Sequence, residues 1–230
     1  MKPLFKGILA IALLAIAAAT PALAYDHIQY DDSYWPRSYY VNAAFGTFFT
    51  WGDVNERPIT VTDSIDEKHK IYTPDMFFFP SPEITLGVNI RSFSLDVNFQ
   101  YWKTSQDLVD IDASEDATIW RVGFEFTYNL FWPEDFQVGV GLGYSYTSLT
   151  TEKAAFIGEK VQDSHLMGSG IALVTNVHYY LTDNFAIVPA VKLYENWFKF
   201  VNSKATGTCD LEPFLWQTYV FASVGVQYQF

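Results

Sequence analysis

Four charged residues attract attention because each lies on the polar side of a stretch in which polar and apolar residues alternate. They are Asp96, Arg121, Glu125 and Lys192. Ionised side chains that are removed from water need partners of opposite charge. Such a group could serve a gated ion path or form an internal salt-bridge network. We expect the network, with a contact between Glu125 and Lys192 and with Asp96 and Arg121 nearby.

A second group of charged residues is acidic and closely spaced. It consists of Asp107, Asp110, Asp112, Glu115 and Asp116. Carboxylate oxygens are ligands for Ca²⁺, so the stretch is a weak candidate for cation binding. It lacks the glycine and the spacing of an EF-hand loop. We therefore interpret it as a hydrated, mutually repulsive surface segment, and we predict no metal centre.

Histidines are the remaining candidates for acid–base chemistry. The chain has four, at positions 27, 69, 165 and 178. A hydrolase that modifies lipids would need a nucleophile beside such a base, but no H-x-S pair or G-x-S-x-G motif accompanies them. His178 is better explained as a hydrogen-bonded interior residue. The sequence predicts no catalytic residues and no cofactor, and enzyme activity is the minority interpretation.

The composition excludes several classes of protein. Of the 230 residues, 50% are hydrophobic, 18% aromatic and 17% charged, and the formal net charge is −12. This is too apolar for a disordered chain and has the wrong sign for a nucleic-acid binder. A single cysteine, Cys209, excludes a disulfide scaffold and suggests a free thiol, shielded by lipid or by a loop.

The N-terminus has the pattern of a secretory signal. Lys2 and Lys6 precede an apolar run over 7–19, and Ala22-Leu23-Ala24 forms an A-x-A cleavage site. The apolar run is shorter than the ~20 residues of a spanning helix. We expect three segments: a signal peptide over 1–24, a short N-terminal segment over 25–38 and one domain over 39–230.

The elements that must position these side chains are β-strands, because apolar residues recur at every second position. In the last strand Ala222, Val224, Val226, Tyr228 and Phe230 share one face, opposite small or polar residues. The same pattern predicts eight strands, at about 39–51, 78–90, 92–102, 118–131, 135–149, 165–181, 184–199 and 215–230. Several of them reach the ~9–11 residues that a tilted strand needs to cross a bilayer.

The connections between these strands alternate in length. Three are tight, and four are long, at 52–77, 103–117, 150–164 and 200–214. The long ones hold 16 Asp and Glu against 7 Lys and Arg, so we expect acidic loops. This layout predicts an all-β fold, an eight-stranded antiparallel up-and-down barrel with two unlike ends.

Such a barrel could be soluble, like a lipocalin, or embedded in a membrane. The polar face is rich in small residues such as Gly139, Gly141 and Gly143, which suit a crowded lumen better than a solvated exterior. The apolar face ends in aromatic residues at the strand tips, such as Tyr39 and Trp51. Two aromatic girdles are typical of a transmembrane barrel, with its apolar face toward lipid.

The C-terminal residues carry a resemblance. Ser223, Gly225, Tyr228 and Phe230 fit the outer-membrane assembly signal, in which a polar residue and a glycine precede an aromatic residue and a terminal aromatic. With the eight-strand layout, the chain resembles the small OmpA/OmpX-type barrels, in architecture over about 39–230 and in motif only in the last strand. The resemblance implies recognition by the barrel-assembly machinery during biogenesis.

These patterns predict an integral protein of the outer membrane of a Gram-negative-type bacterium, in contact with outer-membrane lipid and lipopolysaccharide. We expect a structural or surface-interaction role through acidic extracellular loops, without an open pore and without nucleic acid as a partner; the sequence does not identify what the loops bind. Two alternatives stay open: an outer-leaflet lipid-modifying enzyme on the same barrel and a soluble periplasmic lipocalin-like carrier.

Overall fold

A computed structural model describes residues 38–54, 58–62, 68–73, 78–90, 92–108, 113–131, 136–154, 162–203 and 207–230. These residues all belong to one compact unit, Arg37–Phe230. The predicted signal peptide and nearly all of the segment over 25–38 lie outside the described residues. Among the described residues no helix is long and apolar enough to cross a membrane.

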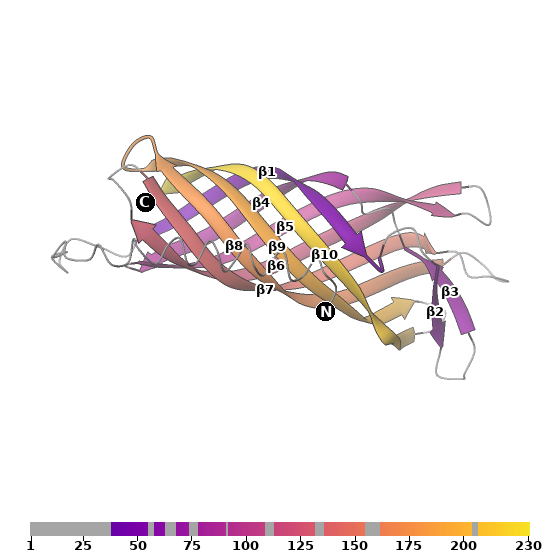
Figure 1. The fold of residues 1–230 in the computed structure, drawn as a ribbon. Coiled ribbons are helices and arrows are strands. Elements are labelled where there is room, and N and C mark those ends of the chain that lie inside the picture. Colours follow the sequence, from indigo (N-terminus) through magenta and orange to yellow (C-terminus); the bar gives the residue numbers. More distant parts are fainter. Residues whose placement is uncertain are drawn as a thin grey trace. The chain divides into compact units, whose positions relative to one another are not determined.

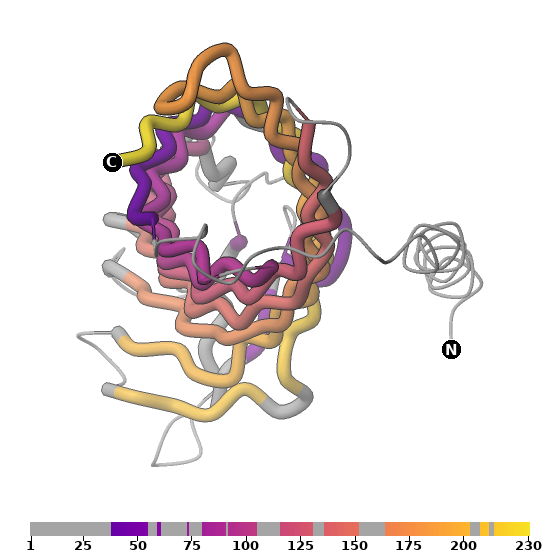
Figure 2. The backbone as a smooth tube through the Cα atoms, turned by 90° about the vertical axis from the view of Figure 1, so that its left-hand side faces the viewer, coloured from indigo at the N-terminus to yellow at the C-terminus, as the bar shows by residue number. Residues whose placement is uncertain are grey.

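Eight long strands form a closed antiparallel barrel, which Figure 2 shows from one end. Around the wall the strand order is β1, β10, β9, β8, β7, β6, β5 and β4, so that the first strand pairs with the last. Their bounds are β1 Ser38–Gly52, β4 Phe78–Ile90, β5 Phe93–Leu108, β6 Ala113–Phe131, β7 Phe136–Ala154, β8 Gln162–Tyr180, β9 Phe185–Ser203 and β10 Gly207–Gln229. The predicted fold class, an eight-stranded antiparallel barrel, is confirmed.

The two ends of the barrel differ. At one end, the turn end, Phe185 N donates to Thr182 O, which closes a short turn between β8 and β9, and Phe230 N donates to Tyr39 O. At the other end, the loop end, β2 (Pro58–Thr62) and β3 (Lys68–Tyr72) form a separate two-stranded sheet. Figure 1 shows this small hairpin beside the loop end of the long strands.

The outer face between the two ends is apolar, as the alternation predicts. Side chains such as Phe45, Leu142 and Val224 are more than half exposed. Aromatic residues border this band in two rings. The turn-end ring contains Tyr39, Phe93, Tyr128, Phe136, Tyr179, Phe185, Tyr228 and Phe230, and the loop-end ring contains Trp51, Tyr101, Trp120, Tyr146, Trp197 and Trp216. Residues 136–146 of β7 span from one ring to the other and match the roughly 9–11 residues of a bilayer-spanning strand.

Above the loop-end ring the polarity of the strands inverts. On β7 the outward position after Tyr146 is Ser148, whereas Leu149 faces inward and is fully buried. The same change on β5, β6 and β8 to β10 contributes to an apolar core that fills the loop end and extends down the lumen as far as Phe221, which pairs in register with Lys192. Its members include Phe48, Val54, Trp102, Ile119, Leu149, Leu166, Phe198, Val201, Cys209, Leu211, Leu215 and Phe221, with Ile59 of β2 packed against them.

This inversion corrects the predicted loops. Strands β5 to β10 continue into the segments predicted as loops at 103–117, 150–164 and 200–214, and the segment 52–77 contains β2 and β3. The sequence-based strand bounds were set by the run of outward-facing apolar residues. That run ends at the loop-end ring, because beyond it the apolar residues face inward. The strand itself continues, since its backbone still pairs with both neighbours, as Leu149 does with Ile119 and Leu166.

Small inward-facing residues make room for the larger polar side chains of the lumen. A Cβ at Gly143 would lie 3.0 Å from Cγ of Glu125, and a Cβ at Gly87 would collide with the side chains of Tyr40 and Asp96. A side chain at Gly87 would therefore displace its neighbours, and one at Gly143 would press against Glu125. The inward-facing glycines thus belong to a filled lumen, as the sequence predicts for a barrel of eight strands.

Candidate functional site

The middle of the lumen contains a buried network of ionised side chains around Lys192. Its Nζ atom lies 2.8 Å from Oε1 of Glu83 and 2.9 Å from Oε1 of Glu125. Lys192 comes from β9, whereas the two carboxylates come from β4 and β6. Each carboxylate is three strands from β9 around the wall, so the two ion pairs cross the lumen.

Two tyrosines extend this network. The Tyr194 hydroxyl donates to Oε1 of Glu125 at 3.3 Å, from the same strand as Lys192. The Tyr40 hydroxyl donates to Oδ1 of Asp96, which joins β1 to β5. All four side chains are almost fully buried. Because both tyrosines donate to carboxylates, they supply part of the hydrogen bonding that water would otherwise provide to these anions.

Arg121 lies apart from the carboxylates, in an aromatic setting. Its guanidinium carbon Cζ lies 3.5 Å from the ring centroid of Tyr194 and 5.0 Å from that of Phe48. The ring centroid of Trp102 lies 6.0 Å from the same Cζ atom. Arg121 is 1% exposed, and none of its three guanidinium nitrogens has a hydrogen-bond partner among the described residues. The planar cation is therefore held mainly by aromatic faces, which attract it electrostatically.

The lumen therefore has two layers. The polar layer holds Glu83, Asp96, Glu125 and Lys192, and the apolar core begins beside it, where Phe221 pairs in register with Lys192, and continues toward the loop end. Arg121 and Tyr194 lie where the layers meet, since Tyr194 contacts both Glu125 and the guanidinium group. This arrangement can brace the wall and obstruct the lumen.

The structure brings Glu125 and Lys192 together, while Asp96 takes Tyr40 as its partner and Arg121 takes aromatic rings. Sequence reasoning left Glu83 out of the charged group, although the alternation on its strand places it on the polar face. Its membership of the charged group could have been predicted from its inward position, where it pairs with Gln100 of β5. The tyrosine partners were not predicted. The alternation pattern counts aromatic residues as apolar, so it gives no sign that Tyr40 or Tyr194 would face the lumen and donate a hydrogen bond there.

The other predicted residues are dispersed. Asp107, Glu115 and Asp116 lie on β5 and β6 near the loop end, and Asp110 and Asp112 lie outside the described residues. Within the described part of the chain, no three acidic, histidine or cysteine residues are grouped so that they could hold a metal ion. Cys209 is buried in the apolar core. The sequence had predicted that it lies in a loop.

The described histidines occupy different surroundings. His178 is buried in the lumen and stacks on Tyr180, with ring centroids 6.2 Å apart. His165 faces outward near the loop end, and its Nδ1 atom lies 2.8 Å from the Thr150 hydroxyl. His69 lies on β3, and His27 is outside the described residues.

The residues of the predicted assembly signal lie on both faces of β10 and at Phe230, directly after it. Ser223 and Gly225 face the lumen, and Tyr228 and Phe230 face outward in the turn-end ring. The Tyr228 ring lies 4.9 Å from that of Phe185 and 6.1 Å from that of Phe230, measured between centroids. The terminal aromatic residues are thus accessible at an exposed end of the wall.

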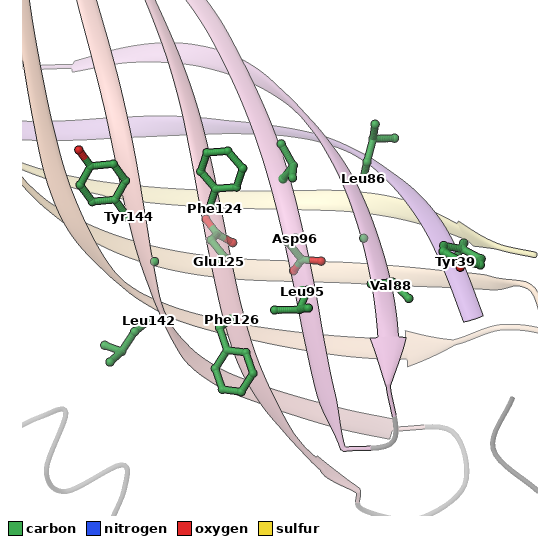
Figure 3. Close-up of a pocket in the computed structure, with 13 residues that line it drawn as sticks. Tyr39, Leu86, Val88, Leu95, Asp96, Phe124, Glu125, Phe126, Leu142 and Tyr144 are labelled. Carbon is green, nitrogen blue, oxygen red and sulfur yellow. The ribbon is translucent and has the colours of Figure 1, made fainter. Parts of the chain in front are cut away.

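A shallow depression occurs on the apolar outer face, over β4 to β7 (Figure 3). Its outward lining includes Leu86, Leu95, Phe124 and Leu142. Asp96 and Glu125 come from the same strands, at the intervening positions whose side chains are buried in the lumen. On these strands, apolar side chains on the outer face and charged side chains in the lumen thus occupy adjacent positions of the same strand.

No protein-family model and no curated protein matches the sequence. Solved structures do match the fold. OprG, an outer membrane protein of Pseudomonas aeruginosa, has a TM-score of 0.51 at 13% identity over 84% of this chain and 95% of its own. Neisserial surface protein A has a TM-score of 0.48 at 16% identity over 85% of this chain and 100% of its own. The Escherichia coli outer membrane protease OmpT has a TM-score of 0.38 at 10% identity, over 84% and 97%.

The likeness to OprG supports the fold that the strand pairing shows: this chain is an eight-stranded barrel of the outer-membrane type. At this level of identity the likeness extends to the fold alone. One fold can carry unrelated functions, so a function has to be argued from the lumen and the outer surface of this chain.

Proposed function

We propose that the protein is an integral outer-membrane barrel with a closed lumen, whose role is structural or is exerted through surface contacts at its loop end. The turn end would face the periplasm and the loop end the cell exterior, the usual arrangement in such barrels. The single observation that carries the proposal is the inversion of polarity at the loop-end ring along strands β5 to β10.

The inversion marks where the solvent around the barrel changes. Between the rings the outer face is apolar and the lumen holds Lys192, Glu83 and Glu125, as expected of a wall in contact with lipid. Beyond the loop-end ring the inner face is mainly apolar, as expected of a wall in contact with water. A soluble carrier would need an apolar inner face and a polar outer face along its whole length. If this barrel were soluble, its broad apolar outer band would lie in water.

The lumen supports a role without conduction. The ion pairs of Lys192 cross the lumen, and the Arg121 aromatic cluster and the apolar core follow toward the loop end. Eight-stranded barrels generally have interiors that side chains fill. We therefore expect the acidic loops and the rim of the loop end to be the parts that meet partners, with lipopolysaccharide as the neighbouring lipid.

Extraction from membranes provides the first test. The full-length protein should sediment with outer membranes, require detergent for extraction and migrate differently on gels before and after boiling. Recovery of a stable protein in buffer without detergent would contradict the proposal. In planar bilayers the folded barrel should give no stepwise conductance, and a regular single-channel conductance would rule out the closed lumen.

Biogenesis forms part of the same proposal. We propose that residues 1–24 are removed after export and that the last strand is recognised by the barrel-assembly machinery. Mass spectrometry of protein purified from membranes should give a chain that begins at Tyr25. A chain that still carries the apolar run at 7–19 would contradict the predicted cleavage.

A further inference from the structure

A row of polar side chains crosses the outer face directly above the loop-end ring. Thr118 of β6 pairs in register with Lys103 of β5 on one side and with Thr150 of β7 on the other. Thr150 pairs in turn with His165 of β8. These four residues, which we call the Lys103 row, lie on four consecutive strands of the wall. With strands ~4.8 Å apart, the row is about 14 Å wide.

The side chains of the Lys103 row face outward, because their neighbours along each strand face the lumen. Leu149 and Thr151, on either side of Thr150, are fully buried. Lys103 itself is exposed. The Thr150 hydroxyl lies 2.8 Å from Nδ1 of His165, so a hydrogen bond holds this half of the row in place.

The row contains no acidic side chain, although the chain as a whole has a net charge of −12. The register extends the row to Asn202 on β9 and Thr208 on β10, which are also uncharged. The next outward position on β6 above the row is Asp116, which is exposed. Along these six strands the row therefore offers an ammonium group and neutral hydrogen-bonding groups at a level without carboxylates.

The height of the row relative to the aromatic residues places it at the level of lipid headgroups. Lys103 follows Tyr101 by one outward position, and Thr118 lies one outward position above Trp120. The rings of Trp120 and Tyr146, with centroids 5.5 Å apart, belong to the loop-end ring. Such rings mark the border between hydrocarbon and headgroups, so side chains one step farther out meet the headgroups themselves.

The chemistry of the row suits an anionic glycolipid. The Lys103 ammonium group can donate to phosphate oxygens as a compact point charge. The threonine hydroxyls both donate and accept hydrogen bonds, as sugar hydroxyls do, and they can bind a sugar ring. A phospholipid such as phosphatidylglycerol has a phosphate but no sugar, whereas lipid A has a phosphorylated disaccharide. A free metal cation finds no carboxylate in the row to bind.

We infer that the Lys103 row binds the phosphorylated sugar headgroup of lipid A, with Lys103 on a phosphate group and the threonines on the sugars. This inference rests on the proposed orientation of the barrel, in which the loop end faces the cell exterior and lipopolysaccharide is the neighbouring lipid. It goes beyond that proposal because it names the headgroup and the residues that bind it, on β5 to β8.

Native mass spectrometry of the full-length barrel in detergent tests the inference. The probes are diphosphoryl lipid A, the same lipid without its phosphate groups, and phosphatidylglycerol. EDTA is present throughout, because divalent cations could otherwise bridge phosphates to acidic residues. The wild-type barrel should retain diphosphoryl lipid A about tenfold better than either of the other lipids, which is the effect of one charge-assisted hydrogen bond.

Three variants assign this preference to the row. Lys103→Gln should remove most of it, because the ammonium group is lost. Lys199→Gln is the matched control and should leave it unchanged, since Lys199 is an exposed lysine on β9 outside the row. A double variant with Thr118→Val and Thr150→Val keeps the β-branched shape and should weaken the retention of both forms of lipid A, but not that of phosphatidylglycerol.

Equal retention of the three lipids by the wild-type barrel would overturn the inference, as would a preference that survives Lys103→Gln. If Lys199→Gln removes as much of the preference as Lys103→Gln, binding follows overall charge and the inference is overturned as well. A gel shift on boiling should confirm that each variant is folded. If the protein needs no detergent at all, the membrane proposal fails; if it is embedded but does not prefer lipid A, only this inference fails.

Discussion

Lys192 on β9 reaches Glu83 on β4 across the lumen, with 2.8 Å between Nζ and Oε1. The same ammonium group also lies 2.9 Å from Glu125 on β6. One cation thus connects three strands that do not adjoin one another in the wall. Because all three side chains are almost fully buried, the network acts as an internal brace whose loss cannot be replaced by bulk water.

Replacing Lys192 by methionine should destabilise the barrel. Two buried carboxylates would lose their common counter-ion, and removing one partner of a buried pair typically costs about 3–5 kcal/mol. The free energy of unfolding can be measured by urea titration in phospholipid vesicles, with tryptophan fluorescence as the signal.

The matched control for this prediction neutralises the partners as well. A triple variant with Lys192→Met, Glu83→Gln and Glu125→Gln should recover part of the lost stability, because no unpaired charge remains in the lumen. A Lys192→Met protein as stable as the wild type would contradict the brace.

Arg121 should be replaceable by lysine only at a cost, although the charge is kept. A lysine has no planar group to stack on Tyr194, so we expect a loss of about 0.5–2 kcal/mol. A double-mutant cycle of Arg121→Lys with Tyr194→Leu isolates this interaction from other effects of either change. Additive losses of unfolding free energy would show that the stacking contributes nothing.

The inversion of polarity predicts unlike outcomes for two leucines on β7. Leu149 is fully buried in the apolar core, whereas Leu142 is 67% exposed on the outer face between the rings. Leu149→Ala should cost about 2–5 kcal/mol through the cavity it leaves. Leu142→Ala should cost within about 0.5 kcal/mol, because lipid chains fill the space. Equal losses in vesicles would contradict the assignment of the two faces.

Deletion of Phe230 should reduce the fraction of protein that assembles in the membrane. The prediction follows from the assembly motif, and the heat-modifiable band on gels of isolated membranes measures it. Phe185→Ala is the control, since Phe185 lies in the same turn-end ring but outside the motif. If both changes act alike, Phe230 contributes only as a ring residue; normal assembly without Phe230 would contradict the signal.

The sequence by itself determined the features that depend on a period of two. Along Phe136 to Tyr146 the alternation assigns every side chain to a face, because successive residues of a strand point to opposite sides. The number of barrel strands, the apolar outer band and the aromatic rings follow from this local rule, whereas β2 and β3 were missed. The motif ending in Phe230 is equally local, and so is the inward position of Asp96, Arg121, Glu125 and Lys192.

Only the tertiary structure decided which inward-facing residues meet. Lys192 and Glu83 are 109 positions apart, and their contact depends on closure of the wall between β1 and β10 and on the register of each pair. The same holds for Tyr40 with Asp96 and for Arg121 with its aromatic rings. The lengths of the strands were also decided there. Beyond the loop-end ring the apolar residues turn inward while the backbone pairing continues, so the pattern of outward apolar residues ends before the strand does.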